Sequence, residues 1–220
     1  MTDQHGRRIV AVVVTFNRLE MLQRQLQRLA ELPELDEVLV VDNASTDGTG
    51  EWLRSQPVTA ETLATNTGGA GGFSHGLERA IGSGADLVWL MDDDGLPEPD
   101  CLTLLLERAD LDFWGPAVLA AQDPGRLCFP IRLPGGSTVV HEMAEVEKAA
   151  VDGLIEGVLI PFNGVLVTRE LVERIGLPRE EFFIWGDDHE YRLRAEEAGA
   201  RVATVVTSTC LLYTSDAADE

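Results

Sequence analysis

The first hundred residues alternate between apolar runs and amphipathic segments. Three of the four runs are rich in Val, Ile and Leu and show no polar alternation, as expected for strands buried on both faces of a sheet, and the third, at 60–66, is weaker. These strands are predicted at 8–17, 37–45, 60–66 and 85–91. Helices are predicted between them, at 18–31, 48–55 and 73–82. Strands that alternate with helices predict an α/β fold with a doubly wound, mostly parallel central sheet.

The second half of the chain is less regular, which predicts a smaller antiparallel element beside this sheet. We expect strands at 113–120, 126–133 and 200–206, a hairpin or paired strands at 157–168, and helices at 169–176 and within 178–199. Because no repeat or linker is visible, residues 1–209 are interpreted as a single domain. Residues 210–220 read CLLYTSDAADE, which resembles translated sequencing-adapter read-through. We therefore expect a non-native tail there and a natural domain that is truncated at its C-terminal end.

The composition of the chain argues against several functional classes of protein. The chain has 38 acidic and 17 basic residues and a formal net charge of −21, which argues against nonspecific binding to nucleic acid. No apolar run reaches the roughly 18 residues that span a bilayer, and no signal peptide precedes the first strand, so a cytoplasmic location is expected. The three cysteines show no paired spacing, which favours buried, unreactive thiols over a disulfide or zinc site.

Polar side chains follow each predicted strand of the parallel sheet. Ligands bind such sheets at the carboxyl ends of their strands, so these side chains are expected to line one crevice. They are Thr15, Asn17, Arg18, Asp42, Asn43, Asn66 and the run Asp92, Asp93 and Asp94.

The three consecutive aspartates are the first candidate for chemistry. Asp92 and Asp94 lie two apart after a hydrophobic strand, so both carboxylates can reach one Mg²⁺ or Mn²⁺ ion that in turn holds a diphosphate. The alternative is an acidic turn ahead of the next helix. Position at the tip of the fourth strand favours the metal site.

Two further motifs carry weaker signals. The stretch TNTGGAGGFSHG places glycines directly before a predicted helix, where backbone amides can approach an anion, although a flexible loop is an equal alternative. The stretch FFIWGDDHEYRLR joins aromatic residues to Asp187, Asp188 and Glu190, a combination that suits a sugar-binding site with a general base. Its alternative is a helix whose acidic first turn complements the helix dipole, with Glu190 paired to Arg194 and His189 on the surface.

Taken together, the motifs VVTFNR, VVDNASTDGT, NTGGAGGF, WLMDDDG and FFIWGDDHEYRLRAEEAG resemble glycosyltransferase family 2 from about residue 9 to residue 206. The family has the GT-A fold and an inverting mechanism. Within it the motifs are similar to those of bacterial galactofuranosyltransferases, and rhamnosyltransferases share much of the pattern. The resemblance implies transfer of a sugar, galactofuranose from UDP-galactofuranose or rhamnose from dTDP-rhamnose, to a glycan or lipid-linked acceptor. Such an acceptor is compatible with peripheral contact at the inner face of the membrane.

The resemblance also implies roles for individual residues. Asp188 matches the catalytic base, and Trp185, Asp187 and Glu190 match acceptor contacts. Asp92 and Asp94 match the ligands of a divalent cation, Mn²⁺ or Mg²⁺. The remaining matches border the nucleotide-sugar, with Asp42 accepting a hydrogen bond from the base and Arg18 near base or diphosphate. They are Thr15, Asn17, Arg18, Asp42, Asn66, Gly68, Gly69, Asp92 and Asp93.

One departure concerns the metal site. In the galactofuranosyltransferases a histidine beyond the acidic helix completes the metal coordination, and no histidine follows His189 here. A noncatalytic domain that retains the sugar-nucleotide cleft therefore stays open as an alternative. A nucleotidyltransferase is disfavoured, because TFNRLEML leads straight into a helix with no glycine-rich and basic loop.

Overall fold

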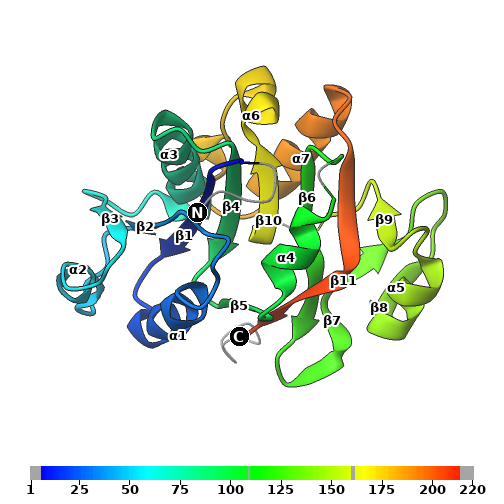
Figure 1. Cartoon of the computed structure of the whole chain (residues 1–220), viewed down its shortest axis with the longest axis horizontal. Coiled ribbons are helices and arrows are strands. Elements are labelled where there is room, and N and C mark those ends of the chain that lie inside the picture. The colour runs from blue at the N-terminus through cyan, green and yellow to red at the C-terminus, as the bar shows by residue number, and fades with distance from the viewer. Residues whose placement is uncertain (1–5, 109, 160–161, 214–220) are drawn as a thin grey trace.

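The computed structural model describes residues 6–108, 110–159 and 162–213 (Figure 1). The strands are β1 (Ile9–Thr15), β2 (Glu37–Asp42), β3 (Thr59–Thr62), β4 (Leu87–Asp92), β5 (Gly95–Pro97), β6 (Phe113–Ala120), β7 (Asp123–Arg132), β8 (Val139–Glu142), β9 (Leu154–Glu156), β10 (Asn163–Thr168) and β11 (Val202–Leu212). The helices are α1 (Leu19–Leu29), α2 (Thr49–Leu53), α3 (Gly68–Gly82), α4 (Cys101–Leu106), α5 (Met143–Ala149), α6 (Arg169–Ile175) and α7 (Asp187–Glu197), with a 3₁₀ turn η1 (Glu180–Phe182).

The central sheet has the strand order β3-β2-β1-β4-β10-β6-β11-β5. The first four strands in this order are parallel to one another, as the sequence predicts. Strand β10 runs antiparallel to both of its neighbours, and β11 pairs in parallel with β6. The result is a mixed α/β sheet with a parallel half, in agreement with the predicted fold class.

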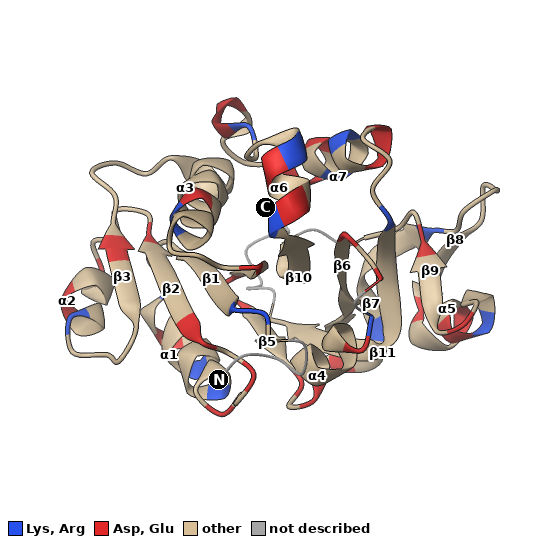
Figure 2. Ribbon diagram, turned by 45° about the horizontal axis from the view of Figure 1, so that its top comes forward, with Lys and Arg blue, Asp and Glu red and all other residues tan. Residues whose placement is uncertain are grey.

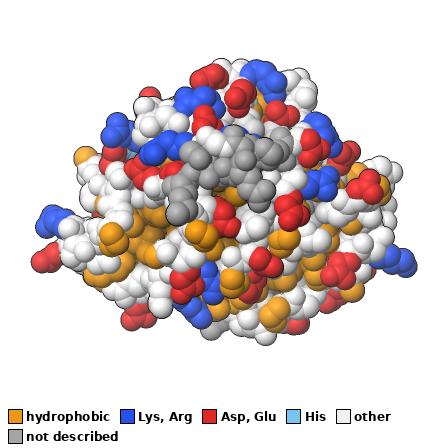
Figure 3. Space-filling view, viewed as in Figure 1, with side chains coloured by type: hydrophobic (Ala, Val, Ile, Leu, Met, Phe, Trp, Pro, Cys, Tyr) orange, Lys and Arg blue, Asp and Glu red, His pale blue; other side chains and the backbone are white. Residues whose placement is uncertain are grey.

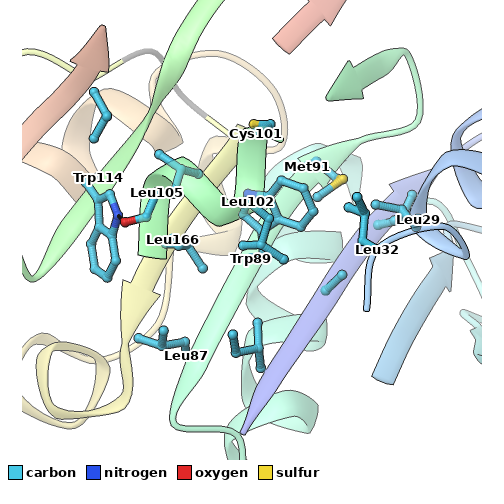
Figure 4. Close-up of a cluster of buried hydrophobic side chains, with 14 of the residues drawn as sticks. Leu29, Leu32, Leu87, Trp89, Met91, Cys101, Leu102, Leu105, Trp114 and Leu166 are labelled. Atoms are coloured by element: carbon cyan, nitrogen blue, oxygen red, sulfur yellow. Dashed lines mark hydrogen bonds between the residues drawn. The ribbon is translucent and has the colours of Figure 1, made fainter. Parts of the chain in front are cut away.

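Helices cover both faces of this sheet (Figures 1 and 2). On one face, α1 and α4 pack over a cluster that includes Leu22, Trp89 and Trp114. Figure 4 shows part of this cluster, where the Trp114 indole Nε1 donates a hydrogen bond of 2.9 Å to the carbonyl of Leu105. On the other face, α3, α6 and α7 pack over a second cluster. The two cores hold the carboxyl ends of β1, β2 and β4 in fixed register.

Helix α3 begins earlier than the sequence analysis predicted. The glycines at 68, 69, 71 and 72 were expected to precede the helix, and the structure places them inside it. A close approach between helix and sheet explains part of this glycine content. A Cβ atom on Gly76 would overlap the side chain of Val12 in β1 and lie 3.1 Å from that of Val41 in β2. Glycines therefore allow α3 to lie directly on the parallel strands.

The close packing of α3 on the sheet predicts that a larger residue at position 76 destabilises the protein. We expect Gly76→Ala to lower the free energy of unfolding by about 1–3 kcal/mol, because the added methyl group overlaps β1. Gly82→Ala, at the end of the same helix, is the matched control because a Cβ there meets nothing within 4 Å. We expect it to be neutral or slightly stabilising. Urea denaturation of both variants measures the difference, and equal midpoints would contradict the packing argument.

Several elements of the second half differ from the prediction. Within the described part of 157–168 the structure has one strand, β10, which pairs with β4 and β6, so the described residues do not form the hairpin alternative. Residues 160 and 161 lie outside the description. Strand β8 and helix α5 were not predicted, and together with β7 they cover a third hydrophobic cluster.

The end of the chain is part of the sheet as far as it is described. Strand β11 continues through Leu212, and its last residues, Cys210–Leu212, pair with both β5 and β6. Residues 214–220 of the expected tail lie outside the described range, so the origin of 210–220 stays a prediction. No helix in the described part of the chain combines the length and apolar composition that a membrane span requires.

The expectation of buried thiols holds for two of the three cysteines. All three cysteines are free; Cys101 and Cys210 are buried and Cys128 is partly exposed. Burial raises the pKa of the Cys101 thiol to about 12. Acidic side chains are spread over the visible face in Figure 3, among basic and hydrophobic ones.

Candidate functional site

The carboxyl ends of three parallel strands meet at one edge of the sheet. In the strand register, Thr15 at the end of β1 pairs with Asp42 of β2, and Val14 pairs with Asp92 of β4. The polar residues that follow these strands are therefore neighbours, as the sequence analysis expected.

The acid loop, which we define as Asp92, Asp93 and Asp94, is held by side chains from the β1 end of the site. Thr15 Oγ1 donates a hydrogen bond of 2.6 Å to Asp93 Oδ2. Arg18 Nη1 donates to Asp93 Oδ1 at 3.2 Å and to Asp94 Oδ2 at 2.6 Å. One guanidinium group thus bridges two carboxylates of the loop.

Burial acts on all three carboxyl groups, and repulsion between neighbouring charges adds to it at Asp92 and Asp93. Burial raises the pKa of Asp92 well above its usual range, and the charges of Asp94 and Asp93 raise it further. Burial likewise raises the pKa of Asp93 to about 6, against the opposing effects of Thr15 and Arg18. The pKa of Asp94 is also raised by burial, with Arg18 opposing. A cation bound nearby would stabilise the ionised form of such buried carboxyl groups.

Gln25 holds the backbone of the acid loop, a role that the sequence analysis missed. Its side-chain Nε2 donates to the carbonyl of Asp92 at 2.6 Å and to that of Gly95 at 2.8 Å. The residue is buried on the apolar face of α1, between Leu22 and Leu26. A glutamine within a stripe of leucines is the signal that could have identified it, because a buried amide needs partners.

We expect Gln25→Leu to lower the free energy of unfolding by about 2–4 kcal/mol, because two buried carbonyl groups lose their donor. Gln23→Leu on the exposed face of the same helix is the control. Denaturant melts of the two variants measure the loss. A Gln25→Leu protein as stable as the control variant would show that water or backbone adjustment replaces the amide.

The loops after β1 and β2 are tied together. Asn17 Oδ1 accepts a hydrogen bond of 2.7 Å from the backbone of Thr46, and the backbone of Asn17 donates to Ser45 Oγ. Asp42 is fully buried; its two oxygens accept from Ser45 N at 2.9 Å and from Thr62 Oγ1 at 3.1 Å. Because Asp42 has no exposed surface, contact between its carboxylate and a nucleotide base would require the residues that cover it to move.

The start of α3 joins the segments that follow β2 and β3 to the loop before α7. Asn66 Oδ1 accepts from Gly68 N at 2.8 Å, and the buried Asn43 donates from Nδ2 to the carbonyl of Gly68. Gly68 has φ 72°, and a Cβ there would overlap the carbonyl oxygen of Phe183. That carbonyl accepts a hydrogen bond of 3.1 Å from Ala70 N. Glycine is required at position 68 for this contact.

Helix α7 presents its acidic first turn as predicted, but the acids differ in environment. Asp187 is buried, and this burial raises its pKa, with Asp188 adding to the effect. Asp188 lines a cavity of about 160 Å³ together with Phe113, Leu159, Phe162, His189 and Arg192. Glu190 is engaged in ion pairs with Arg194 at 2.9 Å and Arg179 at 3.3 Å. Of the three acids, Asp188 faces an open space.

The aromatic residues before α7 do not pack into the core. Trp185 is 82% exposed and Phe183 is 49% exposed. Both have left-handed backbone angles, with φ 74° and 58°, which is unfavourable for residues with large side chains. An exposed aromatic side chain held in this way is available for a ligand.

Phe162 connects the two acid groups of the site. Its carbonyl accepts a hydrogen bond of 3.0 Å from Asp92 N, and its ring lines the cavity that contains Asp188. Asp187 is close enough to Asp92 for its charge to raise the pKa of Asp92. The acid loop and the start of α7 are therefore linked through Phe162, but their side chains line different cavities: Asp93 and Asp94 line a small one beside α1, and Asp188 lines the one described above.

Comparison with known proteins decides the family. The profile described as Glycosyl transferase family 2 matches residues 10–138. The chain belongs to glycosyltransferase family 2. Galactofuranosyltransferase GlfT1 of Mycolicibacterium smegmatis is 34% identical over 215 residues, covering 94% of this chain and 71% of that protein. The chain is thus a glycosyltransferase, as the motifs indicated.

Solved structures show the GT-A fold for this transferase. Mannosyltransferase PcManGT from Pyrobaculum calidifontis, in complex with GDP-Man and Mn²⁺, matches with a TM-score of 0.66 and 20% identity over 96% of this chain. GalNAc-T7 with UDP, GalNAc and Mn²⁺ matches with a TM-score of 0.73 and 13% identity over 97% of this chain. The transferase spans 58% and 45% of those two chains.

The acid loop of the transferase fits a divalent cation in part. Asp92 and Asp94 would supply carboxylate oxygens, and Mg²⁺ is often held by one or two carboxylates together with substrate phosphates. Among the described residues no group of three His, Cys, Asp or Glu side chains is arranged to hold a metal ion. The protein would therefore contribute a carboxylate pair and leave other positions to the donor and to water.

Proposed function

We propose that this transferase moves galactofuranose from UDP-galactofuranose to a hydroxyl group of a glycan or lipid-linked acceptor, with inversion at the anomeric carbon and in dependence on a divalent cation. The position of Phe162 carries the proposal, because this residue accepts a hydrogen bond from the backbone of the buried acid loop and also lines the cavity that contains Asp188. The 34% identity with GlfT1 supports galactofuranose as the sugar.

The proposed donor site follows the strand ends. The loops after β1 and β2, tied together by Asn17 and Thr46, would border the nucleotide. The backbone at Asn66, Gly68 and Gly69 would border the sugar or diphosphate at the start of α3. Asp92 and Asp94 would hold the cation, which when bound neutralises charge on the departing diphosphate. Asp93, fixed by Thr15 and Arg18, would lie beside the ribose or the sugar.

The proposed acceptor site lies at the start of α7. Asp188 would take the proton from the acceptor hydroxyl as that oxygen attacks the anomeric carbon. Asp187 and Trp185 would contact the acceptor. Glu190 would act mainly by fixing the helix, because both of its carboxylate oxygens are paired with arginines.

A thermal-shift panel tests the donor. We expect UDP-galactofuranose with Mn²⁺ to raise the melting temperature more than dTDP-rhamnose or UDP-glucose does, and the shift to disappear in EDTA. A larger shift with dTDP-rhamnose would identify the rhamnosyltransferase alternative instead. Binding of UDP-galactofuranose without turnover on any acceptor would favour the noncatalytic domain.

The exposed aromatic residue offers a separate test of the acceptor side. We expect Trp185→Ala to raise the KM for the acceptor about tenfold or more, because an aromatic ring that stacks on a sugar is lost. The melting temperature should stay unchanged, since the ring makes little contact within the protein. Equal acceptor KM values for the variant and the wild type would remove Trp185 from the acceptor site.

A further inference from the structure

Among the described residues, Arg18 is the basic side chain that forms ion pairs with the acid loop. It lies between β1 and α1, at the N-cap of α1, and its side chain is 44% exposed. The carboxylates that it contacts are more deeply buried, with side-chain exposures of 4% for Asp93 and 16% for Asp94. A solvent-accessible arginine thus neutralises carboxylates that are largely removed from water.

The two carboxylates depend on Arg18 to different degrees. Asp93 also accepts a hydrogen bond of 2.6 Å from the hydroxyl of Thr15, so it keeps a partner when Arg18 moves. For Asp94, the side-chain partner that the structure gives is Arg18, at 2.6 Å. Movement of Arg18 would therefore release Asp94 and leave Asp93 in place.

A divalent cation on Asp94 would meet the same carboxylate that Arg18 occupies. Two cations held within a few ångströms of each other repel strongly where water is largely excluded. We propose that Arg18 is an exchangeable counter-ion, which pairs with Asp94 in the metal-free protein and leaves it when a divalent cation binds. This inference rests on the metal dependence in the proposed function.

The released guanidinium would have a second partner. Arg18 is partly exposed beside the acid loop, the proposed donor carries a diphosphate, and arginine binds phosphate oxygens through its planar array of donors. Arg18 therefore has opposite effects on two ligands: it competes with the bare metal ion and assists the nucleoside diphosphate. This opposition separates the inference from a general effect of charge.

Binding of Mn²⁺ to the full chain without nucleotide tests the competition, with free Mn²⁺ followed by electron paramagnetic resonance. We expect Arg18→Gln to bind Mn²⁺ about tenfold more tightly than the wild type, because the competing cation is gone. Arg24→Gln is the matched control, since it removes one positive charge from the same helix. Arg24 contacts the hydroxyl and ring of Tyr213 and makes no ion pair with the acid loop. We expect its Mn²⁺ affinity to stay within about twofold of the wild type.

The same variants are then titrated with UDP at saturating Mn²⁺. Here we expect Arg18→Gln to bind UDP about tenfold more weakly, the opposite direction to its effect on the metal ion. Arg18→Lys keeps the charge without the planar fork, and its Mn²⁺ affinity should fall between those of the wild type and Arg18→Gln. Melting curves in EDTA verify that each variant is folded, and Arg18→Lys carries the test if the glutamine variant is not.

The outcomes distinguish this inference from the proposed function. If the wild type binds Mn²⁺ through Asp94 but Arg18→Gln and Arg24→Gln share its affinity, the exchange is wrong and metal dependence stands. If the wild type binds no Mn²⁺ with or without UDP, both ideas fail together. Tighter Mn²⁺ binding by Arg18→Gln alone supports the exchange.

Discussion

Replacing Asp188 with asparagine is expected to lower the rate of sugar transfer by about 10²–10⁴-fold. Asparagine has nearly the shape of aspartate but cannot accept the proton of an acceptor hydroxyl at neutral pH. Asp188 lines the cavity beside Phe162 and lies on the surface of α7, so the variant should fold normally. Initial rates of transfer at saturating donor and acceptor measure the loss, and UDP affinity should stay at the wild-type value.

Asp187→Asn is the comparison for this variant. Asp187 is buried, and its charge raises the pKa of Asp92. The Asp187→Asn variant should therefore disturb the surroundings of the acid loop, and it should lower the transfer rate less than Asp188→Asn does. The reverse order, with Asp187→Asn inactive and Asp188→Asn active, would move the base to Asp187. Full activity of Asp188→Asn would contradict the proposed mechanism.

Replacing Asp94 with alanine is expected to reduce the Mn²⁺-dependent affinity for UDP by about 10- to 100-fold. The variant loses one of the two carboxylates proposed to hold the cation, and it also removes one of the two ion pairs of Arg18. Calorimetric titration of UDP with Mn²⁺ and again with EDTA isolates the metal-dependent part.

Asp123→Ala is the control for Asp94→Ala, because Asp123 is an exposed carboxylate at the start of β7. It should leave both titrations unchanged. An Asp94→Ala protein that retains the full Mn²⁺ effect would exclude Asp94 as a ligand.

Much of the first half of the fold could be predicted because its signals are local. Continuous apolar runs identified β1, β2 and β4, and leucines at helical spacing identified α1. The convergence of Thr15, Asp42 and Asp92 followed from a general property of parallel sheets. These residues needed no knowledge of distant contacts.

The rest depends on contacts between distant segments. The partners of β10 are β4 and β6, which lie far away in the sequence, so a local reading of 157–168 could not choose between a hairpin and strands paired elsewhere. The contact between Gly68 and Phe183 joins residues 115 positions apart, and no sequence pattern announces it. The ion pair between Arg18 and Asp94 also joins residues that are far apart in the sequence. Position and burial of such side chains come from the structure alone.

The most direct test of the central claim, that the acid loop and the start of α7 act together on an activated sugar, is release of UDP from UDP-galactofuranose in the presence of acceptor glycosides. The account predicts UDP release that requires Mn²⁺ or Mg²⁺, is lost in EDTA and is nearly absent in Asp188→Asn. Release at the same rate in Asp188→Asn, or in EDTA, would contradict it.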